Sequence, residues 1–290
     1  MTGGDSRRGM VLVIVLWTIA LCSALAMAAS VNFRSFVGIV AIDRDRVRGD
    51  ALLTAGLEVA AGLAMDWPDK PLLDRETTLD LASGSVSVQM SDEGGRIDLG
   101  KAPAELLAHL LLSVGAPQSQ AESVAQSIIR WRSRDQARSE NQGPSQAQAE
   151  QTNEGLFADV DQVAEVPGMT PEWVAAIRPL TTVFGAETVN PLTAPAGVIA
   201  CVPGVDRDQL QAFLAARRSS PNDAAGLATI LGAGQRFVAA KPQQVVSIKL
   251  AAMLADGYGA AAHAVIVLLP HDQQPYRLLV WTPLHSSAVL

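Results

Sequence analysis

The sequence predicts an α+β protein that begins with one long helix and carries a helical region inserted into a small antiparallel sheet. An apolar run of 22 uncharged residues, 10–31, leads directly into an amphipathic helical pattern. Alternating strand patterns occur near residue 85 and again after residue 244, and signals for short helices fill the space between them. With 290 residues the chain is long enough to bury a substantial core.

Composition narrows the classes of partner. The net charge is −7, which disfavours nucleic acid and anionic lipid headgroups because both select for excess Lys and Arg. Apolar residues make up 49% of the chain, and part of that excess lies near the N-terminus. Cys22 and Cys201 are far apart and do not form a disulfide framework, so we expect two free thiols.

The apolar run 10–31 has the length of a membrane span. As a helix it measures roughly 33 Å, enough to cross a hydrocarbon core of about 30 Å. It is too long for the apolar core of a secretory signal peptide, and Ala26-Met27-Ala28 is a weak cleavage site. A plain membrane anchor is therefore one interpretation. Basic residues lie on both sides of the run, so charge does not fix its orientation.

The helical pattern continues after the apolar run. Apolar residues recur on one face of a helix, and Pro68 is expected to end it; this face consists of Leu53, Leu57, Ala60, Ala61 and Ala64. The two segments together would form a single rod.

The next segment mixes strand and helix signals. Ser85 to Met90 alternates as a strand does, and Gly94-Gly95 predicts a turn. An apolar helix ends near Gly115, and Ser119 with Glu122 fits a capping box that opens another helix. The polar stretch 133–155 is predicted to be a long loop.

Short helices follow the polar stretch, and strands end the chain. Thr170-Pro171 and the segment beginning at Asp206 are typical helix starts. Strand patterns return over 246–252, 264–269 and 276–282. A sheet that begins near residue 85 would therefore be completed after residue 244, around a helical insertion.

Several motifs resemble those of one family. Arg7-Arg8-Gly9-Met10 resembles the junction of type IV prepilins and pseudopilins, where a prepilin peptidase cuts after the glycine. Together with this junction, four further stretches resemble the general secretion pathway protein K (GspK) family. This family comprises the K-type minor pseudopilins of type II secretion. The four stretches are Gly95-Arg96-Ile97-Asp98-Leu99 with Ala102-Pro103, Val166-Pro167-Gly168-Met169-Thr170, Val189-Asn190 with Thr193-Ala194-Pro195, and Tyr276-Arg277-Leu278-Leu279-Val280-Trp281. The resemblance covers nearly the whole chain.

The resemblance implies a pilin-like architecture with defined boundaries. Residues 1–9 would be a cleaved leader, 10–31 the membrane-spanning half of the long helix, and 32–67 its periplasmic half. Residues 68–99 and 241–290 would form the sheet domain. Residues 100–240 would form an inserted helical domain that contains the polar loop 133–155.

The resemblance also implies a role. Most pseudopilins carry glutamate at the fifth mature position; this chain has Ile14 there, and the K-type branch is the one that lacks that glutamate. The protein would be processed between Gly9 and Met10, methylated at the new amine, and held in the bacterial inner membrane by a single span. It would sit at the pseudopilus tip with I- and J-type minor pseudopilins. Prepilin peptidase and the inner-membrane secretion platform would be further partners, and nucleic acid would not.

Helical domains of this family are similar to calcium-binding examples, whose acidic loop follows a helix ending in a Trp-x-Asp pattern. Here Ser133 replaces the expected acid after Trp131. Calcium takes six to eight oxygen ligands. Possible donors are Asp135, Glu140, Glu150, Glu154 and Asp159. Solvated loop charges explain the same residues.

Two other functions fit the sequence less well. Val166-Pro167-Gly168 and Val202-Pro203-Gly204 resemble helix-hairpin-helix DNA-binding motifs of membrane-anchored competence proteins. However, Thr170 and Asp206 stand where a second glycine would be, and an aspartate repels phosphate. An enzyme is not expected, because the four histidines lack metal-ligand spacing and no nucleophile motif occurs.

Overall fold

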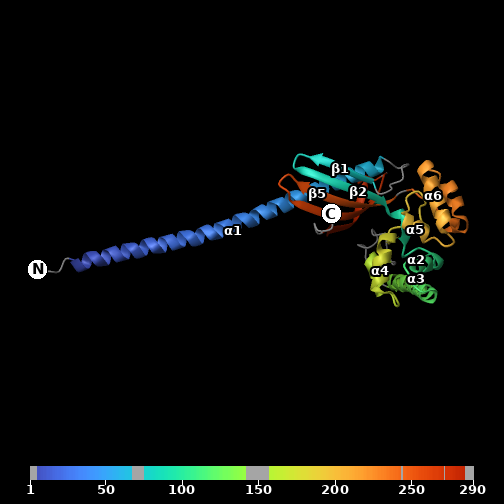
Figure 1. Cartoon of the computed structure of the whole chain (residues 1–290), viewed down its shortest axis with the longest axis horizontal. Helices are drawn as coiled ribbons and strands as arrows, with labels where there is room; N and C mark the ends of the chain where they lie inside the picture. Colours follow the sequence, from blue (N-terminus) through green and yellow to red (C-terminus); the bar gives the residue numbers. More distant parts are fainter. Residues whose placement is uncertain (1–4, 67–74, 142–156, 243, 271, 285–290) are drawn as a thin grey trace.

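A single helix dominates the N-terminal part of the molecule. The computed structural model of the chain describes residues 5–66, 75–141, 157–242, 244–270 and 272–284. Helix α1 (Asp5–Met65) spans 61 residues without a break, and its first half projects far from the folded body (Figure 1). At the α-helical rise of 1.5 Å per residue its length is roughly 90 Å. The predicted single rod is confirmed over this range.

The C-terminal half of α1 packs on the sheet through the predicted face. The five apolar residues of that face are each at most 4% exposed. The projecting half instead exposes large apolar side chains, such as Ile14, Trp17 and Leu21, each more than half exposed. Within the residues that the structure describes, none of the helices is long and apolar enough to cross a membrane. The membrane-spanning role of 10–31 stays a prediction.

The sheet has five antiparallel strands in the order β1-β2-β5-β6-β7. These are β1 (Arg75–Leu81), β2 (Gly84–Asp92), β5 (Val245–Leu254), β6 (Gly259–Leu268) and β7 (Tyr276–Leu284). Strand β2 pairs with β5, as Val88 opposite Leu250 shows, so segments from both sides of the helical region form the middle of the sheet. This pairing confirms the prediction that a sheet begun near residue 85 is completed after residue 244.

The inner face of the sheet and α1 share one apolar core. Alternate residues of β2, such as Val86 and Val88, are fully buried in it, together with Ile248 and Leu250 of β5. Such alternation is the pattern of a sheet with one buried face. Strand β1 was not predicted, because its sequence Arg-Glu-Thr-Thr-Leu-Asp-Leu carries few apolar residues, which suits an edge strand.

The helical domain lies between β2 and β5 in sequence and at the end of the sheet away from the free half of α1 (Figure 1). It begins after η1 (Glu93–Gly95) and contains one short parallel pair, β3 (Ile97–Asp98) with β4 (Thr181–Thr182). Its helices are α2 (Ala104–Ser113), α3 (Gln118–Asn141), η2 (Val160–Glu165), α4 (Pro171–Ile177), η3 (Arg178–Leu180), α5 (Ala196–Ala200), α6 (Arg207–Ser219), α7 (Ala224–Ile230) and η4 (Gly232–Phe237). They bury an apolar core of their own, distinct from the core under α1.

Local signals explain where two of the helices begin. The Thr170 side chain caps α4, with Pro171 at its first position, and Asp206 with Gln209 forms a capping box on α6. A positive φ precedes each helix, +91° at Gly168 and +81° at Gly204, and only glycine adopts it without strain. Both helix starts were predicted.

Two predictions around α3 are wrong. The helix begins at Gln118, one residue before Ser119, so Ser119 lies inside the helix and does not cap it. The helix also continues to Asn141, so residues 133–141 are helical although 133–155 was predicted to be a loop. Polar composition misled the prediction, because Arg, Gln, Ala and Glu are good helix formers and the first breakers are Gly143-Pro144. Residues 142–156 lie outside the described part of the chain.

Candidate functional site

Buried polar side chains gather where the chain passes between the sheet and the helical domain. Five such residues are each at most 7% exposed: Asp92 and Glu93 lie where the chain leaves β2, and Asp98, Asn190 and Thr193 lie in the helical domain. Buried polar groups are costly unless hydrogen-bonded. The connections between the two domains therefore form the candidate site.

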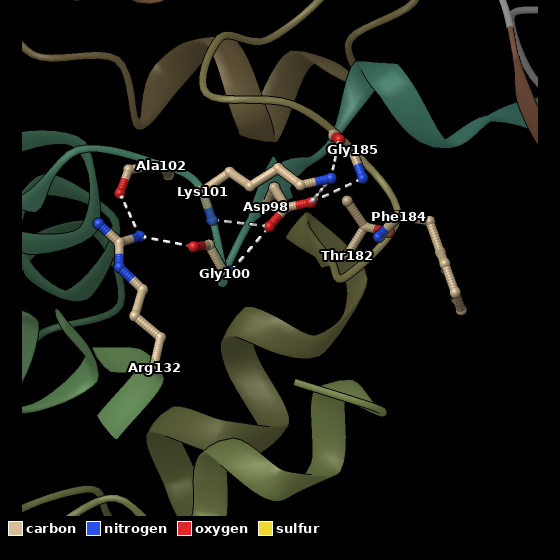
Figure 2. Close-up of polar contacts among 8 residues, drawn as sticks. All are labelled: Asp98, Gly100, Lys101, Ala102, Arg132, Thr182, Phe184 and Gly185. Atoms are coloured by element: carbon tan, nitrogen blue, oxygen red, sulfur yellow. Dashed lines mark hydrogen bonds and ion pairs between the residues drawn. The ribbon is translucent and has the colours of Figure 1, made fainter. Parts of the chain in front are cut away.

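Asp98 closes the first connecting turn (Figure 2). Its Oδ1 accepts hydrogen bonds from the backbone N–H groups of Gly100 (2.7 Å) and Lys101 (2.9 Å), and its Oδ2 accepts one from Gly185 (2.7 Å). The Lys101 Nζ lies 3.9 Å from Oδ2 and donates to the Gly185 carbonyl. Burial raises the pKa of Asp98, although Lys101 and the three N–H groups oppose that rise. Asp98 thus ties the start of the helical domain to the segment after β4.

An arginine supports the same turn from α3. Arg132 donates from Nη1 to the carbonyl oxygens of Gly100 (2.9 Å) and Ala102 (3.0 Å), as Figure 2 shows. Burial lowers the pKa of Arg132, while Asp98 and Glu187 nearby raise it. A guanidinium remains charged in proteins, so these are charge-assisted hydrogen bonds.

The same arrangement recurs further along the chain. The sequence Ile97-Asp98-x-x-x-Ala102-Pro103-Ala104 is matched by Val189-Asn190-x-x-x-Ala194-Pro195-Ala196. The Oδ1 of Asn190 accepts from the N–H of Leu192 (3.1 Å), as Asp98 accepts from Gly100. The carbonyls of Asp98 and Asn190 each accept the N–H of the alanine four residues on, both at 2.9 Å.

The supporting arginine recurs too. Arg217 on α6 donates from Nη1 to the carbonyl oxygens of Pro191 (3.3 Å) and Ala194 (2.6 Å). Its guanidinium also lies over the Phe213 ring, 5.3 Å from the centroid. Burial lowers the pKa of Arg217. The helical domain therefore contains two copies of one turn, each braced by an arginine from a following helix.

The two copies differ in the residue that closes the turn. In the first copy, the Oδ2 of Asp98 accepts a hydrogen bond from the backbone N–H of Gly185, so this position requires an acceptor. In the second, the Nδ2 of Asn190 donates to the Asp92 carboxylate (3.2 Å) and to the carbonyl of Lys241 (3.4 Å), which requires a donor. The identity of each residue, acid or amide, follows from the group that it meets.

Asp92 is the last residue of β2 and lies beside the second copy. Its carboxylate accepts from the Thr193 hydroxyl (2.7 Å), from Asn190 and from the N–H of Gly94 (2.9 Å). Burial raises the pKa of Asp92, the three hydrogen bonds oppose that rise, and neighbouring Glu93 adds to it. Glu93 itself pairs with Arg96 at 3.1 Å.

The groups of this constellation hydrogen-bond to other groups of the chain itself. Its carboxylates are saturated by backbone and side-chain donors. Across the described residues, no three His, Cys, Asp or Glu side chains gather so as to hold a metal ion. The site's chemical capacity is the positioning of one domain on the other.

The predicted processing residues lie far from this joint. The backbone of Gly9 and Met10 is part of α1, but their side chains are not among those described. Ile14 lies on the projecting half of α1 and is 54% exposed. Processing at this junction stays a prediction.

Of the five predicted calcium donors, only Asp159 has a side chain that the structure describes. Asp159 caps η2, where its side chain accepts from the N–H of Asp161 at 2.7 Å. Asp135 and Glu140 are on the α3 backbone, but their side chains are not described, and Glu150 and Glu154 lie outside the described residues. Calcium binding therefore stays a prediction.

The helix-hairpin-helix alternative finds no support at either hairpin. A phosphate would need the free N–H groups at the starts of the following helices. Those positions are used by the chain itself: Thr170 accepts from the N–H of Trp173 (3.3 Å), and Asp206 from that of Gln209 (2.8 Å). The Asp206 carboxylate occupies the place that an anion would take.

Sequence reasoning missed the roles of Asp92, Asn190 and the two arginines. It treated the segments around Asp98 and Asn190 as separate motifs. Their common pattern, an apolar residue, Asp or Asn, and Ala-Pro-Ala four to six residues later, is the signal that would have revealed the repeated turn. The contact of Asn190 with Asp92 joins residues 98 positions apart and has no local signal.

Comparisons with known proteins agree with the resemblance drawn from the motifs. The family model described as type II secretion system (T2SS), protein K, matches residues 88–186. A chain from the crystal structure of the GspK-GspI-GspJ complex of the type 2 secretion system of enterotoxigenic Escherichia coli is similar in fold. The TM-score is 0.52 at 15% identity, and the match covers 83% of this chain and all of that one. No curated protein sequence matches the chain.

Proposed function

We propose that this chain, whose residues 88–186 belong to the type II secretion protein K family, acts as a minor pseudopilin that supports assembly of the pseudopilus and export of folded proteins across the outer membrane. The observation that carries the proposal is the arrangement of three parts. A long helix projects from one end of a small antiparallel sheet, and a helical domain covers the other end (Figure 1).

The projecting half of α1 supports attachment to other helices or to lipid. Several of its large apolar side chains, such as Leu16, Trp17, Leu21 and Leu25, are more than 60% exposed. A soluble protein rarely exposes so much contiguous apolar surface. We place this half in the inner membrane, as a single span, with the sheet and helical domains in the periplasm. Prepilin peptidase and the inner-membrane secretion platform would be its partners there.

The helical domain supports a position at the tip. It extends the molecule beyond the sheet, away from the free half of α1 (Figure 1). Bulk at this end would obstruct a further subunit stacked above. Ile14 supports the same position by resemblance. In pilin-like fibres a glutamate at the fifth mature position meets the N-terminal amine of a neighbour, and an unpaired carboxylate in apolar surroundings is costly. A subunit with no neighbour above gains nothing from that glutamate.

The partners proposed are the I- and J-type minor pseudopilins. Support comes from the fold shared with a chain of a GspK-GspI-GspJ complex. A deletion of this gene in its own host, complemented with the full-length chain, tests the function. We expect type II substrates to accumulate in the periplasm without the chain and to be secreted again with it.

Affinity purification of the full-length chain from detergent-solubilised membranes provides the second measurement. Mass spectrometry should identify the I- and J-type proteins. A strain that secretes normally without the chain, but loses DNA uptake, would overturn the proposal in favour of the competence-type alternative.

A further inference from the structure

Among the residues that the structure describes, the two domains share no apolar core. Apolar residues of the helical domain, such as Leu106 and Phe213, cluster separately from those under α1, such as Leu57 and Ile248. Apolar interfaces fix domain orientation when they are large, and small polar ones permit relative motion. The contacts on its two connecting segments therefore contribute to holding the helical domain in one orientation.

Those contacts converge on Asn190. Its backbone N–H donates to the carbonyl of Gly94 (2.8 Å), on the segment that enters the helical domain. Its Nδ2 donates to Asp92, at the end of β2, and to the carbonyl of Lys241, on the segment that returns to β5. One residue thus connects both chain crossings between the domains.

Two neighbours reinforce the arrangement. The Thr193 hydroxyl donates to the same oxygen of Asp92 that Asn190 contacts, at 2.7 Å. The backbone of Thr193 also approaches Gly95 so closely that an added Cβ would lie 2.7 Å from its carbonyl oxygen. Real Cβ atoms do not come this near, so the entering segment and the second copy of the turn are in direct backbone contact.

The buried Asp92 carboxylate is stabilised by hydrogen bonds and not by an ion pair with a basic side chain. Among the described residues no Lys, Arg or His side chain forms an ion pair with it, although it is only 4% exposed. A buried carboxylate in this state depends on each donor that reaches it, because an unsatisfied charged group carries its full desolvation cost. If Asn190 and Thr193 no longer donated to it, the Asp92 carboxylate would therefore be more stable when hydrated. Its hydration would require the two domains to separate.

We propose that Asp92, Asn190, Thr193 and the Lys241 carbonyl form an interdomain latch, in which Asn190 is the positioning residue that sets how the helical domain is carried on the sheet. The comparison of the two turns supports this assignment. Asp98, the counterpart of Asn190, closes its turn within the helical domain, whereas Asn190 extends the same geometry to the sheet. The proposal concerns the joint itself and does not depend on the secretion role.

The test measures the distance between the domains in the full-length chain in detergent micelles. Spin labels are placed at Ser83, on the exposed turn before β2, and at Gln211, on the exposed face of α6. The native thiols are first removed by Cys22→Ser and Cys201→Ser. Double electron–electron resonance then gives the distance distribution, and circular dichroism reports whether each variant is folded. We expect one narrow distribution for the parent chain.

Asn190→Asp is the decisive variant. It removes the donor to Asp92 and Lys241 and places a second carboxylate against the first, so we expect the single narrow peak to be lost. Asn222→Asp, the same chemical change at an exposed loop position, is the matched control and should keep the peak. Asp92→Asn combined with Asn190→Asp restores one amide–carboxylate pair and should recover a narrower distribution.

Thr193→Val serves if Asn190→Asp does not fold. It removes one hydroxyl donor at nearly constant volume, and we expect partial broadening. Distributions that stay as narrow as the parent's in every folded latch variant would overturn the proposal. Equal broadening in Asn222→Asp would also overturn it, because the effect would then come from added charge alone.

Discussion

At the scale of single residues, the chain places each polar side chain according to the partner it meets. Asp98 and Asn190 occupy equivalent turns, but one meets an N–H and the other a carboxylate and a carbonyl. A donor and an acceptor are also paired between α1 and the last strand. There the hydroxyl of Tyr276 on β7 donates a hydrogen bond to the carboxylate of Glu58 on α1 at 2.9 Å. Partial burial and, after it, the Glu58 carboxylate together raise the pKa of Tyr276 to about 12.

The Tyr276–Glu58 contact predicts the alkaline behaviour of the chain. The neutral phenol is favoured in the folded state, so its contribution to stability is complete below the usual pKa of about 10 and is lost as the pH rises through about 12. In a Tyr258→Phe background, which leaves one tyrosine, the phenolate absorbance should titrate near the raised value. Glu58→Gln should move the titration towards the ordinary tyrosine value, and Glu76→Gln, on the edge strand, should not. An unchanged titration in Glu58→Gln would contradict the assignment.

Residue-scale roles were the least predictable from sequence. Caps such as Thr170 and Asp206 have local signals, because the donor and acceptor lie three residues apart. The partners of Asn190 and Tyr276 lie far away in sequence and become visible only once the sheet is assembled. Composition and spacing contain no information about which acceptor a buried amide will reach.

At the scale of elements, α1 and α3 each carry an untested prediction. The apolar stripe of α1 against the sheet was readable from its period, because one helix face is buried along its C-terminal half. The C-terminal end of α3 could not be predicted from hydrophobic periodicity. Its last nine residues are polar apart from Ala137, and only their intrinsic propensity favours a helix.

Processing of α1 is predicted between Gly9 and Met10. The full-length chain extracted from membranes of its host should have an intact mass that lacks residues 1–9 and carries one added methyl group. Gly9→Ala should leave the leader in place, while Gly3→Ala, within the leader, should not affect cleavage. A wild-type chain that still begins at Met1, or one cut after Ala28, would contradict the pseudopilin assignment.

Calcium binding is predicted at the acidic residues near the end of α3 and in the segment that follows it. If calcium orders this region, the melting temperature of chelator-treated protein should rise when calcium is added, because a ligand of the folded state stabilises it by mass action. Asp135→Asn with Glu140→Gln should abolish the rise. Asp80→Asn, on the exposed edge strand, is the control and should retain it. No rise at millimolar calcium in the wild type would favour solvated loop charges.

At the scale of the whole molecule, the order of the elements was largely predictable. Alternation in β2 and β5, together with helix signals between them, identified a helical insertion in a sheet, and the strand pairing confirms it. Edge strand β1 was missed because only two of its seven residues, Leu79 and Leu81, are apolar. The repeated turn was missed because two motifs were considered one at a time.

The shape of the molecule predicts where it sits in a fibre. A chain with a helical domain beyond its sheet should occur once per pseudopilus, at the tip. Immunogold labelling of the helical domain should mark one end of assembled pseudopili, and labelling of the major subunit should mark their full length. Ile14→Glu should not convert the chain into a repeating subunit. Gold along the whole fibre for this chain would refute the position.

The pairing of β2 with β5 also affects how the chain reaches its native state. About 150 residues separate these neighbouring strands, and closing a flexible loop of that length costs roughly 4 kcal/mol of chain entropy. The cost falls if the insertion folds first, since its compact form holds Asp92 and Lys241 together through Asn190. We therefore expect α2 and α6 to gain amide protection during refolding before the central strand pair does, so that the insertion acts as a nucleus for the sheet that surrounds it in sequence.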